Sequence, residues 1–400
     1  MKITDLKINN YRSLIDFELK DISDTAILYG ENNAGKSNVL NALYTIFKAK
    51  RKINPSGSFS SRENFYEGIV ENFSNNFYNN IPTNIITFNI KVIIDKNELK
   101  INQTISTLFK ETNNIVEIEG KIVPRATDID QGEITVTSVV VNTKVIYLKN
   151  GTSGVVTYFP SLAESGGATN TSELASAFTE LMSVFNDCVY IIGSNRDMHI
   201  AQMANVPKKL PRNITNGDFK NILHGLYLNP KEHHKFEKID ELLSKPPFKF
   251  GHISFSAEGS AIDIMIKEDK IRFPIKHLGS GVLQSLYIIT SVICCERKIV
   301  CIEELEQNLS PNRQKITLGK LRDIIGENDN PLSQLFISSH SPYFYDKDLH
   351  CSLYFLKINE GKTQIAATRG NQPTAAANAE PEEGYVEYYK EHFPGVENFY

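Results

Sequence analysis

The chain has 400 residues, of which 41% are hydrophobic and 22% are charged, and its net charge is −4. This is the composition of an ordinary globular protein, and the length suits one large domain or two to three smaller ones. The slight negative charge gives no indication of binding to nucleic acid or to an anionic membrane surface. No stretch reaches the ~18 consecutive apolar residues of a membrane-spanning helix, so we expect no membrane partner.

The five cysteines form no CxxC pair and no metal-binding spacing. We therefore expect reduced, mostly buried thiols, as is usual for a protein of the cytoplasm.

The first half of the chain combines strands with one early helix. Two strands are expected before residue 20, a third at residues 25–29, and a helix at residues 37–49. Segments rich in β-branched residues then predict an antiparallel meander, with strands at residues 85–94, 99–109, 115–123 and 134–148. A helix is expected at residues 172–185 and a short buried strand at residues 188–192.

In the second half, strands alternate with helices, which favours an α/β core with a largely parallel sheet. After helical segments within residues 194–250, three strands are expected at residues 252–256, 262–266 and 271–273. A helix at 281–295, a strand at 299–302, a helix at 312–325 and a strand at 335–337 follow. We predict an α/β fold with an N-terminal lobe (1–193), a short helical insertion (194–250), a C-terminal lobe (251–370), and a linker with an aromatic tail (371–400).

The segment Gly30–Ser37 (GENNAGKS) has the pattern GxxxxGK[ST] of a phosphate-binding loop, with a predicted strand before it and a predicted helix after it. Backbone N–H groups of such a loop and the positive end of the helix bind phosphates. Lys36 is expected to reach the β- and γ-phosphates of ATP, and Ser37 to hold Mg²⁺. The nucleotide contacts predicted here are Gly30, Asn32, Asn33, Ala34, Gly35, Lys36, Ser37 and Asn38.

Two later strands end in residues that suit hydrolysis. The segment KIVCIEEL ends in Glu303, which we expect to bind Mg²⁺ directly or through water, and Glu304, which we expect to polarise the attacking water. The segment LFISSHSP places His340 just after a buried strand, where it could contact the γ-phosphate or that water. Alone, a glutamate pair is often only a solvated strand end, and a lone histidine is more often structural.

The order of these motifs resembles the ATPase head of the ABC superfamily, in the branch of RecF, SMC and Rad50 heads and the OLD ATPases. The opening KINNYRSLIDFEL is similar to that branch's first strands, in which an arginine at the position of Arg12 approaches the phosphates. Residues 277–284 (HLGSGVLQ) are similar to the signature motif, residues 308–311 to the D-loop, Glu303 and Glu304 to the Walker B pair, and His340 to the switch histidine. The resemblance implies an ABC-ATPase head that uses ATP and Mg²⁺, with Lys36, Glu304 and His340 as catalytic residues.

The sequence departs from this family pattern at two places. Gly279 stands where the usual signature has serine, so Ser280 and Gly281 are the residues expected to contact a γ-phosphate. No clear Q-loop glutamine is present; Arg196 lies at about the right place, and a plain surface arginine is an equal alternative.

In this class the signature of one subunit completes the ATP site of another, so the resemblance implies a homodimer or higher oligomer closed by ATP. Only 60 residues follow His340, too few for the TOPRIM domain of an OLD nuclease. We therefore expect a separately encoded effector, such as a TOPRIM or other nuclease, regulated as in anti-phage systems of the PARIS kind. The alternatives are a RecF-like repair ATPase that clamps DNA and a nucleotide-binding scaffold with negligible turnover. The aromatic tail could dock the partner or pack on its own domain.

Overall fold

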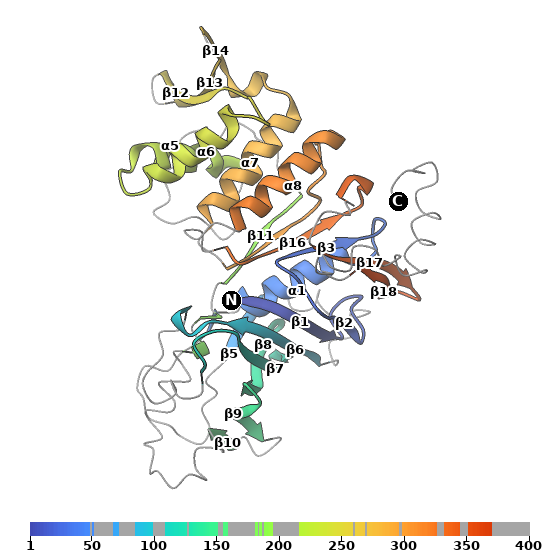
Figure 1. The fold of residues 1–400 in the computed structure, drawn as a ribbon. Helices are drawn as coiled ribbons and strands as arrows, with labels where there is room; N and C mark the ends of the chain where they lie inside the picture. The colour runs from blue at the N-terminus through green and yellow to red at the C-terminus, as the bar shows by residue number, and fades with distance from the viewer. Residues whose placement is uncertain are drawn as a thin grey trace. The chain divides into compact units, whose positions relative to one another are not determined.

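A computed structural model shows the fold (Figure 1). It describes residues 1–48, 50–51, 67–71, 85–98, 109–125, 128–150, 155–158, 181–182, 184–185, 188–194, 216–258, 261–268, 270–295, 298–325, 332–344 and 351–369. The chain divides into two compact units. Unit 1 comprises Met1–Val189 and His350–Pro394, and unit 2 comprises Tyr190–Leu349 and Gly395–Tyr400. Each unit is described by itself below.

Unit 1 contains a large antiparallel sheet with strand order β10-β9-β8-β7-β6-β1-β2, with β5 beside β8 and β4 beside β5 (Figure 1). Its strands are β1 (Lys2–Asn9), β2 (Phe17–Leu19), β4 (Lys50–Arg51), β5 (Glu67–Glu71), β6 (Ile86–Ile94), β7 (Asn114–Arg125), β8 (Asp128–Val141), β9 (Lys144–Asn150) and β10 (Val155–Tyr158). Alternate residues of β6 are buried, the pattern of a sheet with one covered face. The predicted antiparallel meander is confirmed.

One predicted strand of this sheet is wrong in extent. Residues 134–148, expected as a single strand, contain the hairpin of β8 and β9, in which Val141 pairs with Lys144. Asn142 and Thr143 form its turn with φ of 48° and 75°, and positive φ at both positions is the conformation of a type I′ hairpin turn. Apart from Phe109, the strand predicted at 99–109 lies outside the described residues.

Unit 1 also contains β3 (Thr25–Tyr29), which pairs in parallel with β17 (Ser352–Asn359), and β17 pairs antiparallel with β18 (Lys362–Arg369). All five residues of β3 are buried, and helix α1 (Lys36–Lys48) follows the loop after it. This confirms the strand–loop–helix arrangement predicted around the phosphate-binding segment. The β17–β18 hairpin is not among the predicted elements, although Glu360 and Gly361 form its turn with φ of 49° and 74°.

Unit 2 contains the neighbouring strands β11 (Val189–Ile192), β15 (Ile299–Ile302) and β16 (Gln334–Ser339), in that order. Strands β15 and β16 are parallel, from Ile299 opposite Gln334 to Ile302 opposite Ile337, and every residue of the three strands is buried. Helices α7 (Ser280–Cys294) and α8 (Pro311–Ile325) pack against each other (Figure 1). Because β15 and β16 run in the same direction, the residues that follow them meet at one edge.

Unit 2 also contains helices α5 (Asn216–Leu228) and α6 (His233–Ser244) and a three-stranded antiparallel sheet of β12 (His252–Glu258), β13 (Ala261–Glu268) and β14 (Ile271–Pro274). Tyr227, Phe236 and Phe255 form an aromatic cluster that joins both helices to β12. The predicted helices and three strands are confirmed where they are described. Short 3₁₀ turns lie at Lys96–Glu98, Ile275–His277 and Pro342–Phe344.

Three further predictions can be compared with the structure only in part. The helix expected at 172–185 lies mostly outside the described residues, as do Arg196 and the segment 371–400. All five cysteines are buried thiols, as predicted. Among the helices that the structure describes, none is long and apolar enough to cross a membrane. The four-part division into lobes, insertion and tail stays a prediction.

Candidate functional site

The phosphate loop lies in unit 1 between the end of β3 and the start of α1, which begins at Lys36. The ammonium group of Lys36 donates hydrogen bonds to the carbonyl oxygens of Gly30 and Glu31, each at 2.7 Å, and Lys36 is only 7% exposed. The first turn of α1 carries no acidic side chain, so its positive end faces no built-in anion. A buried lysine beside a helix N-terminus without acidic side chains suits a phosphate.

A polar network connects Arg12 to this helix. The guanidinium of Arg12 donates to Oδ1 of Asn38 (3.3 Å), the amide of Asn38 donates to Oγ of Ser13 (2.7 Å), and that hydroxyl bonds Oγ1 of Thr363 (2.6 Å). Arg12 has a φ of 48°, and its Nε is buried without a hydrogen-bond partner among the described residues. An unsatisfied buried donor next to a phosphate loop is consistent with a ligand contact by Arg12.

Thr363, on strand β18, packs against the phosphate loop at Gly35. A Cβ atom added at Gly35 would lie 1.9 Å from Oγ1 of Thr363, and Gly35 has a φ of +92°. The backbone N–H of Thr363 also donates to the carbonyl oxygen of Ser13 (2.8 Å). Glycine is therefore required at position 35 both by backbone conformation and by the close approach of β18.

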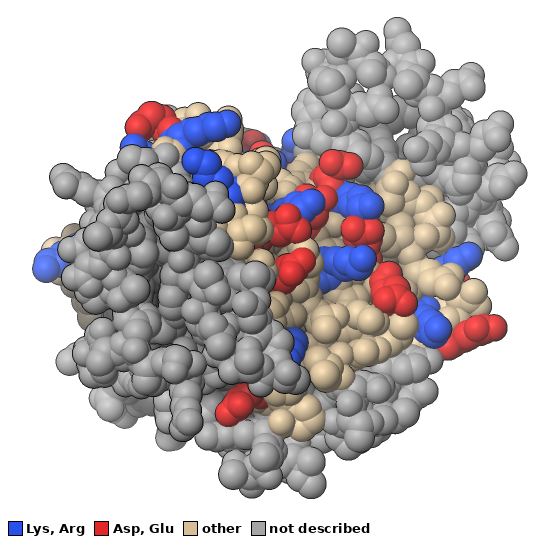
Figure 2. Space-filling view, turned by 90° about the horizontal axis from the view of Figure 1, so that it is seen from below, with Lys and Arg blue, Asp and Glu red and all other residues tan. Residues whose placement is uncertain are grey.

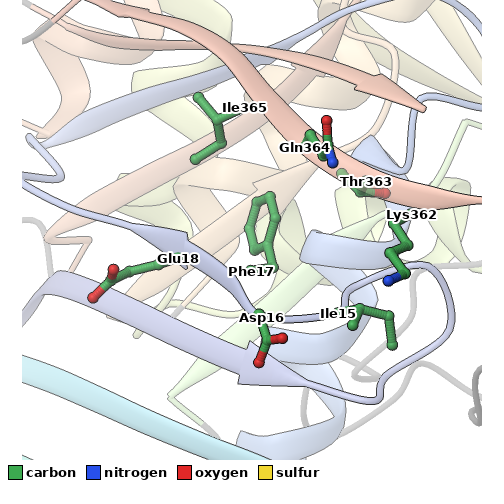
Figure 3. Close-up of a pocket in the computed structure, with 8 residues that line it drawn as sticks. All are labelled: Ile15, Asp16, Phe17, Glu18, Lys362, Thr363, Gln364 and Ile365. Carbon is green, nitrogen blue, oxygen red and sulfur yellow. The ribbon is translucent and has the colours of Figure 1, made fainter. Parts of the chain in front are cut away.

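A pocket of about 410 Å³ is lined by residues 15–18, which lie before and on β2, and by residues 362–365 of β18. Figure 3 shows the ring of Phe17 between the two strands and the side chain of Lys362 pointing toward Ile15. The lining contains none of the predicted nucleotide-binding residues. It is a groove between two sheet edges and is separate from the phosphate loop.

In unit 2, the acidic pair follows β15 directly. The backbone N–H of Glu303 donates to the carbonyl oxygen of Ile192 at the end of β11 (2.9 Å), and that of Glu304 donates to the hydroxyl of Ser338 on β16 (3.1 Å). Three strand ends thus fix the two glutamates. Glu304 has a φ of 46°, a conformation that costs a non-glycine residue energy.

His340 follows β16 at the same edge. Its backbone N–H and its ring Nδ1 both lie within hydrogen-bond distance of Oε1 of Glu306, at 2.7 and 2.9 Å. The side chain of Glu306 is 6% exposed, whereas that of His340 is 51% exposed. The structure therefore brings His340 together with the acidic segment after β15, through a carboxylate that the sequence analysis did not single out.

The signature segment begins helix α7. Gly279 is the residue before the helix, with φ −61° and ψ 148°, and Gly279 and Ser280 are exposed, whereas the helix beyond residue 283 is buried. A Cβ added at Gly281 would lie 2.8 Å from the carbonyl oxygen of Asn308. The D-loop residue Asn308 and the start of the signature helix are thus in close contact within unit 2.

Comparison with known proteins adds the family. Residues 1–158 and 198–345 match the family described as AAA ATPase domain, which is more than half of the chain. The chain belongs to the AAA ATPase domain family. It is an ATPase, and both the phosphate loop and the segment of Glu303, Glu304 and His340 lie within the matched residues.

Relatives of this ATPase are distant in sequence. A Helicobacter pylori protein named ATP/GTP phosphatase is 22% identical over 360 residues, which span 86% of both chains. An uncharacterized protein of Methanocaldococcus jannaschii is 30% identical over 122 residues, which span 30% of this chain and 14% of that protein. A crystal structure of an SMC head bound to the C-winged helix domain of ScpA has a TM-score of 0.52 at 12% identity, and the match covers 95% of this ATPase and all of that chain.

The family match confirms the predicted ATPase, and the likeness to the SMC head confirms the predicted fold. The mixed α/β fold with an antiparallel β part is likewise confirmed. The individual site residues stay predictions, and the structure adds where each one lies. Arg12 and the phosphate-loop residues Gly30 to Asn38 are in unit 1, and Ser280, Gly281, Glu303, Glu304 and His340 are in unit 2.

The residues present fit ATP with Mg²⁺. The loop offers a buried lysine and a helix N-terminus, and Ser37, in the first turn of α1, is exposed. Among the described residues, no three or more His, Cys, Asp or Glu side chains cluster as a metal cage. Mg²⁺ suits such a site, because it is usually held by one or two protein ligands together with substrate phosphates and water.

Proposed function

We propose that this ATPase closes into a dimer when ATP binds, and that the closed state regulates a separately encoded effector. The observation that carries the proposal is the start of α7. Gly279 and Ser280 are exposed at the N-terminus of a 15-residue helix that carries no acidic residue in its first turn. A helix of this kind offers N–H groups and a positive dipole end to a phosphate. In the ABC-type arrangement, that phosphate is held by a second copy of the chain.

In this proposal, unit 1 holds the nucleotide. Lys36 leaves the carbonyl oxygens of Gly30 and Glu31 and pairs with the β- and γ-phosphates, while Asn32, Asn33 and Ala34 contribute backbone N–H groups. Arg12, placed by Asn38, approaches the phosphates through its unsatisfied Nε. Binding of the phosphates would therefore replace the two hydrogen bonds that Lys36 makes to the loop carbonyl oxygens.

Hydrolysis is assigned to the residues at the strand ends of unit 2. Glu303 would hold Mg²⁺ together with Ser37 of the phosphate loop, and the ion would neutralise charge on the phosphates. Glu304, held at a positive φ by Ser338 and the turn after it, polarises the attacking water. His340 contacts that water or the γ-phosphate. Ser280 and Gly281 of a second copy complete the site, so hydrolysis releases the dimer.

We further propose that the effector is a nuclease and that the pair acts in anti-phage defence in the cytoplasm. The support is the shortness of the helices α5 and α6 described between the phosphate loop and residues 277–284, and five buried thiols that suit a reducing compartment. The relative named ATP/GTP phosphatase makes GTP the second nucleotide to be tested as a substrate.

The experiment combines turnover with partner capture. Purified chain, Lys36→Ala and Glu304→Gln are compared for release of phosphate from ATP and GTP, and for co-purification of the product of the adjacent gene with or without ATP. We expect Lys36→Ala to lose nucleotide binding and Glu304→Gln to bind without turnover. Partner recovery that is the same in all three proteins and in all nucleotide states would contradict the proposed regulation.

The alternative is a RecF-like ATPase that clamps DNA. On the face shown in Figure 2, described Lys and Arg side chains lie among Asp and Glu side chains and form no continuous basic surface. Ion pairs such as Lys2–Asp24 and Lys20–Glu18 in unit 1 reflect the same mixture. DNA binding that is ATP-dependent and weakens steeply with salt would favour the clamp over effector control.

A further inference from the structure

Glu306 is a buried carboxylate of which one oxygen accepts hydrogen bonds from described residues and the other does not. Its Oε1 accepts from the backbone N–H of His340 (2.7 Å) and lies 2.9 Å from the ring Nδ1 of the same residue. Its Oε2 is buried and has no hydrogen-bond partner within the described part of the chain. The segment around it is tightly turned, because Gln307 N–H donates to the carbonyl oxygen of Glu304 (3.0 Å) and Leu309 N–H to that of Glu306 (2.9 Å).

A carboxylate is a poor choice here if only stability matters. A buried charge with one unsatisfied oxygen costs stability, and a neutral side chain of similar size would lower the part of that cost due to the charge. The neighbouring contact between Ser341 and Gln314 already connects the histidine segment to α8. The carboxylate adds one thing that these neutral groups do not, which is a strong acceptor directed at both the backbone and the ring of His340.

A strong acceptor at Nδ1 determines which nitrogen carries the proton. An ionised carboxylate can only accept hydrogen bonds, so the ring nitrogen beside it must be Nδ1–H. While the ring is neutral, its other nitrogen, Nε2, is then an acceptor. A phosphate oxygen is also an acceptor and cannot bond to it, whereas a water molecule can.

We propose that Glu306 is a positioning residue that holds His340 in the Nδ1–H tautomer, so that Nε2 accepts a hydrogen bond from the attacking water. This positioning role rests on the proposed function, in which His340 contacts either the attacking water or the γ-phosphate. Of these two partners, the Nδ1–H tautomer favours the water. Glu306 itself touches no reacting atom. Its role is the one that a buried carboxylate performs behind a catalytic or metal-binding histidine.

The test uses the full chain and four variants: Glu306→Leu, Glu306→Gln, His340→Ala and Ser341→Ala. Glu306→Leu removes both acceptors, and Glu306→Gln keeps one neutral acceptor and the packing. Ser341→Ala is the matched control, since it removes a buried hydrogen bond in the same segment without touching the ring. Steady-state kcat and KM for ATP are measured for each, and ¹⁵N NMR of histidine-labelled protein reports the tautomer, with His340→Ala identifying the signal.

We expect Glu306→Leu to lower kcat by about 10- to 100-fold, the range for carboxylates behind functional histidines, and Glu306→Gln to lower it less. KM for ATP should stay within about twofold, because the residues proposed to bind the nucleotide are elsewhere. The His340 signal should change from the Nδ1–H form in wild type toward the Nε2–H form in Glu306→Leu, and Ser341→Ala should keep the wild-type signal and kcat.

The failures of the two proposals are distinguishable. If His340→Ala keeps wild-type turnover, the proposed role of His340 is wrong and the role of Glu306 with it. If His340→Ala is inactive but Glu306→Leu and Glu306→Gln keep both wild-type kcat and the Nδ1–H signal, only the positioning role is overturned. Equal losses in Ser341→Ala and Glu306→Gln with an unchanged tautomer also overturn it, because they indicate a structural role alone.

Discussion

Two glycines in the adjacent helices α7 and α8 provide a sharp test of the contact between the signature helix and the D-loop. Replacing glycine by alanine inside a helix stabilises it by about 1 kcal/mol through backbone conformation alone. At Gly319 in α8 an added Cβ meets nothing within 4 Å. At Gly281 in α7 it would lie 2.8 Å from the carbonyl oxygen of Asn308, so the two must separate by about 0.6 Å to reach the 3.4 Å of ordinary contact.

The expected effects have opposite signs. Gly319→Ala should raise the free energy of unfolding by about 0.5–1 kcal/mol. Gly281→Ala gains less free energy of unfolding from helix propensity, because residue 281 lies in the first turn of α7. It also carries an overpacking cost of about 1–3 kcal/mol. The net change for Gly281→Ala is roughly 0–2 kcal/mol of destabilisation. At about 2–4 °C per kcal/mol for a unit of this size, the melting temperatures of the two variants should differ by roughly 1–12 °C.

Thermal unfolding followed by circular dichroism measures both variants under the same conditions, with wild type between them. Gly281→Ala should also lower ATP turnover if the signature helix acts as proposed, whereas Gly319→Ala should keep it. If Gly281→Ala melts above wild type together with Gly319→Ala and hydrolyses ATP at the wild-type rate, the close approach of Asn308 to the signature helix is refuted.

Three further predictions concern other parts of the molecule. Gly279→Ser should stabilise by a few tenths of a kcal/mol as an N-cap, since the position has open space and a φ of −61°; a lower melting temperature would contradict this. Thr363→Val removes the hydroxyl behind the phosphate loop and should cost about 1 kcal/mol and raise KM for ATP more than it lowers kcat; unchanged KM, measured by titration, would count against the network. Burial raises the pKa of the Cys294 thiol to about 12, and all five thiols are buried. A thiol reagent at pH 8 should therefore label almost none in the native protein and five after denaturation, and rapid native labelling would refute the burial.

The sequence predicted the elements around the site because the signals there are local. A buried strand, a glycine-containing loop and a periodic helix are adjacent in the chain, so residues 25–49 could be assigned from their own pattern. The same holds for residues 281–302, where an apolar helix and a four-residue apolar strand precede Glu303. The hairpin of β8 and β9 was harder, because its turn is Asn142–Thr143 rather than the Asn-Gly or Asp-Gly that signals a two-residue turn.

The parts that were missed depend on contacts between distant residues. Thr363 lies 350 positions from Ser13, and only the pairing of β18 in unit 1 brings their hydroxyls to 2.6 Å. Glu306 had a weak local signal, as a third acidic residue two positions after the Walker B pair. Its hydrogen bonds to His340, 34 positions later, depend on the parallel register of β15 and β16. His340 could be identified from the sequence, whereas Glu306, which is proposed to orient it, could be identified only from the fold.

The most direct test of the central claim is the mass of the protein in solution with and without nucleotide. Size exclusion with light scattering should show Glu304→Gln doubling from the 45.1 kDa of the chain to about 90 kDa when ATP and Mg²⁺ are added, because hydrolysis no longer opens the dimer. Lys36→Ala should keep the nucleotide-free mass under the same conditions. A mass of Glu304→Gln that does not change with ATP, in protein shown to have ATP bound, would contradict a dimer closed by nucleotide.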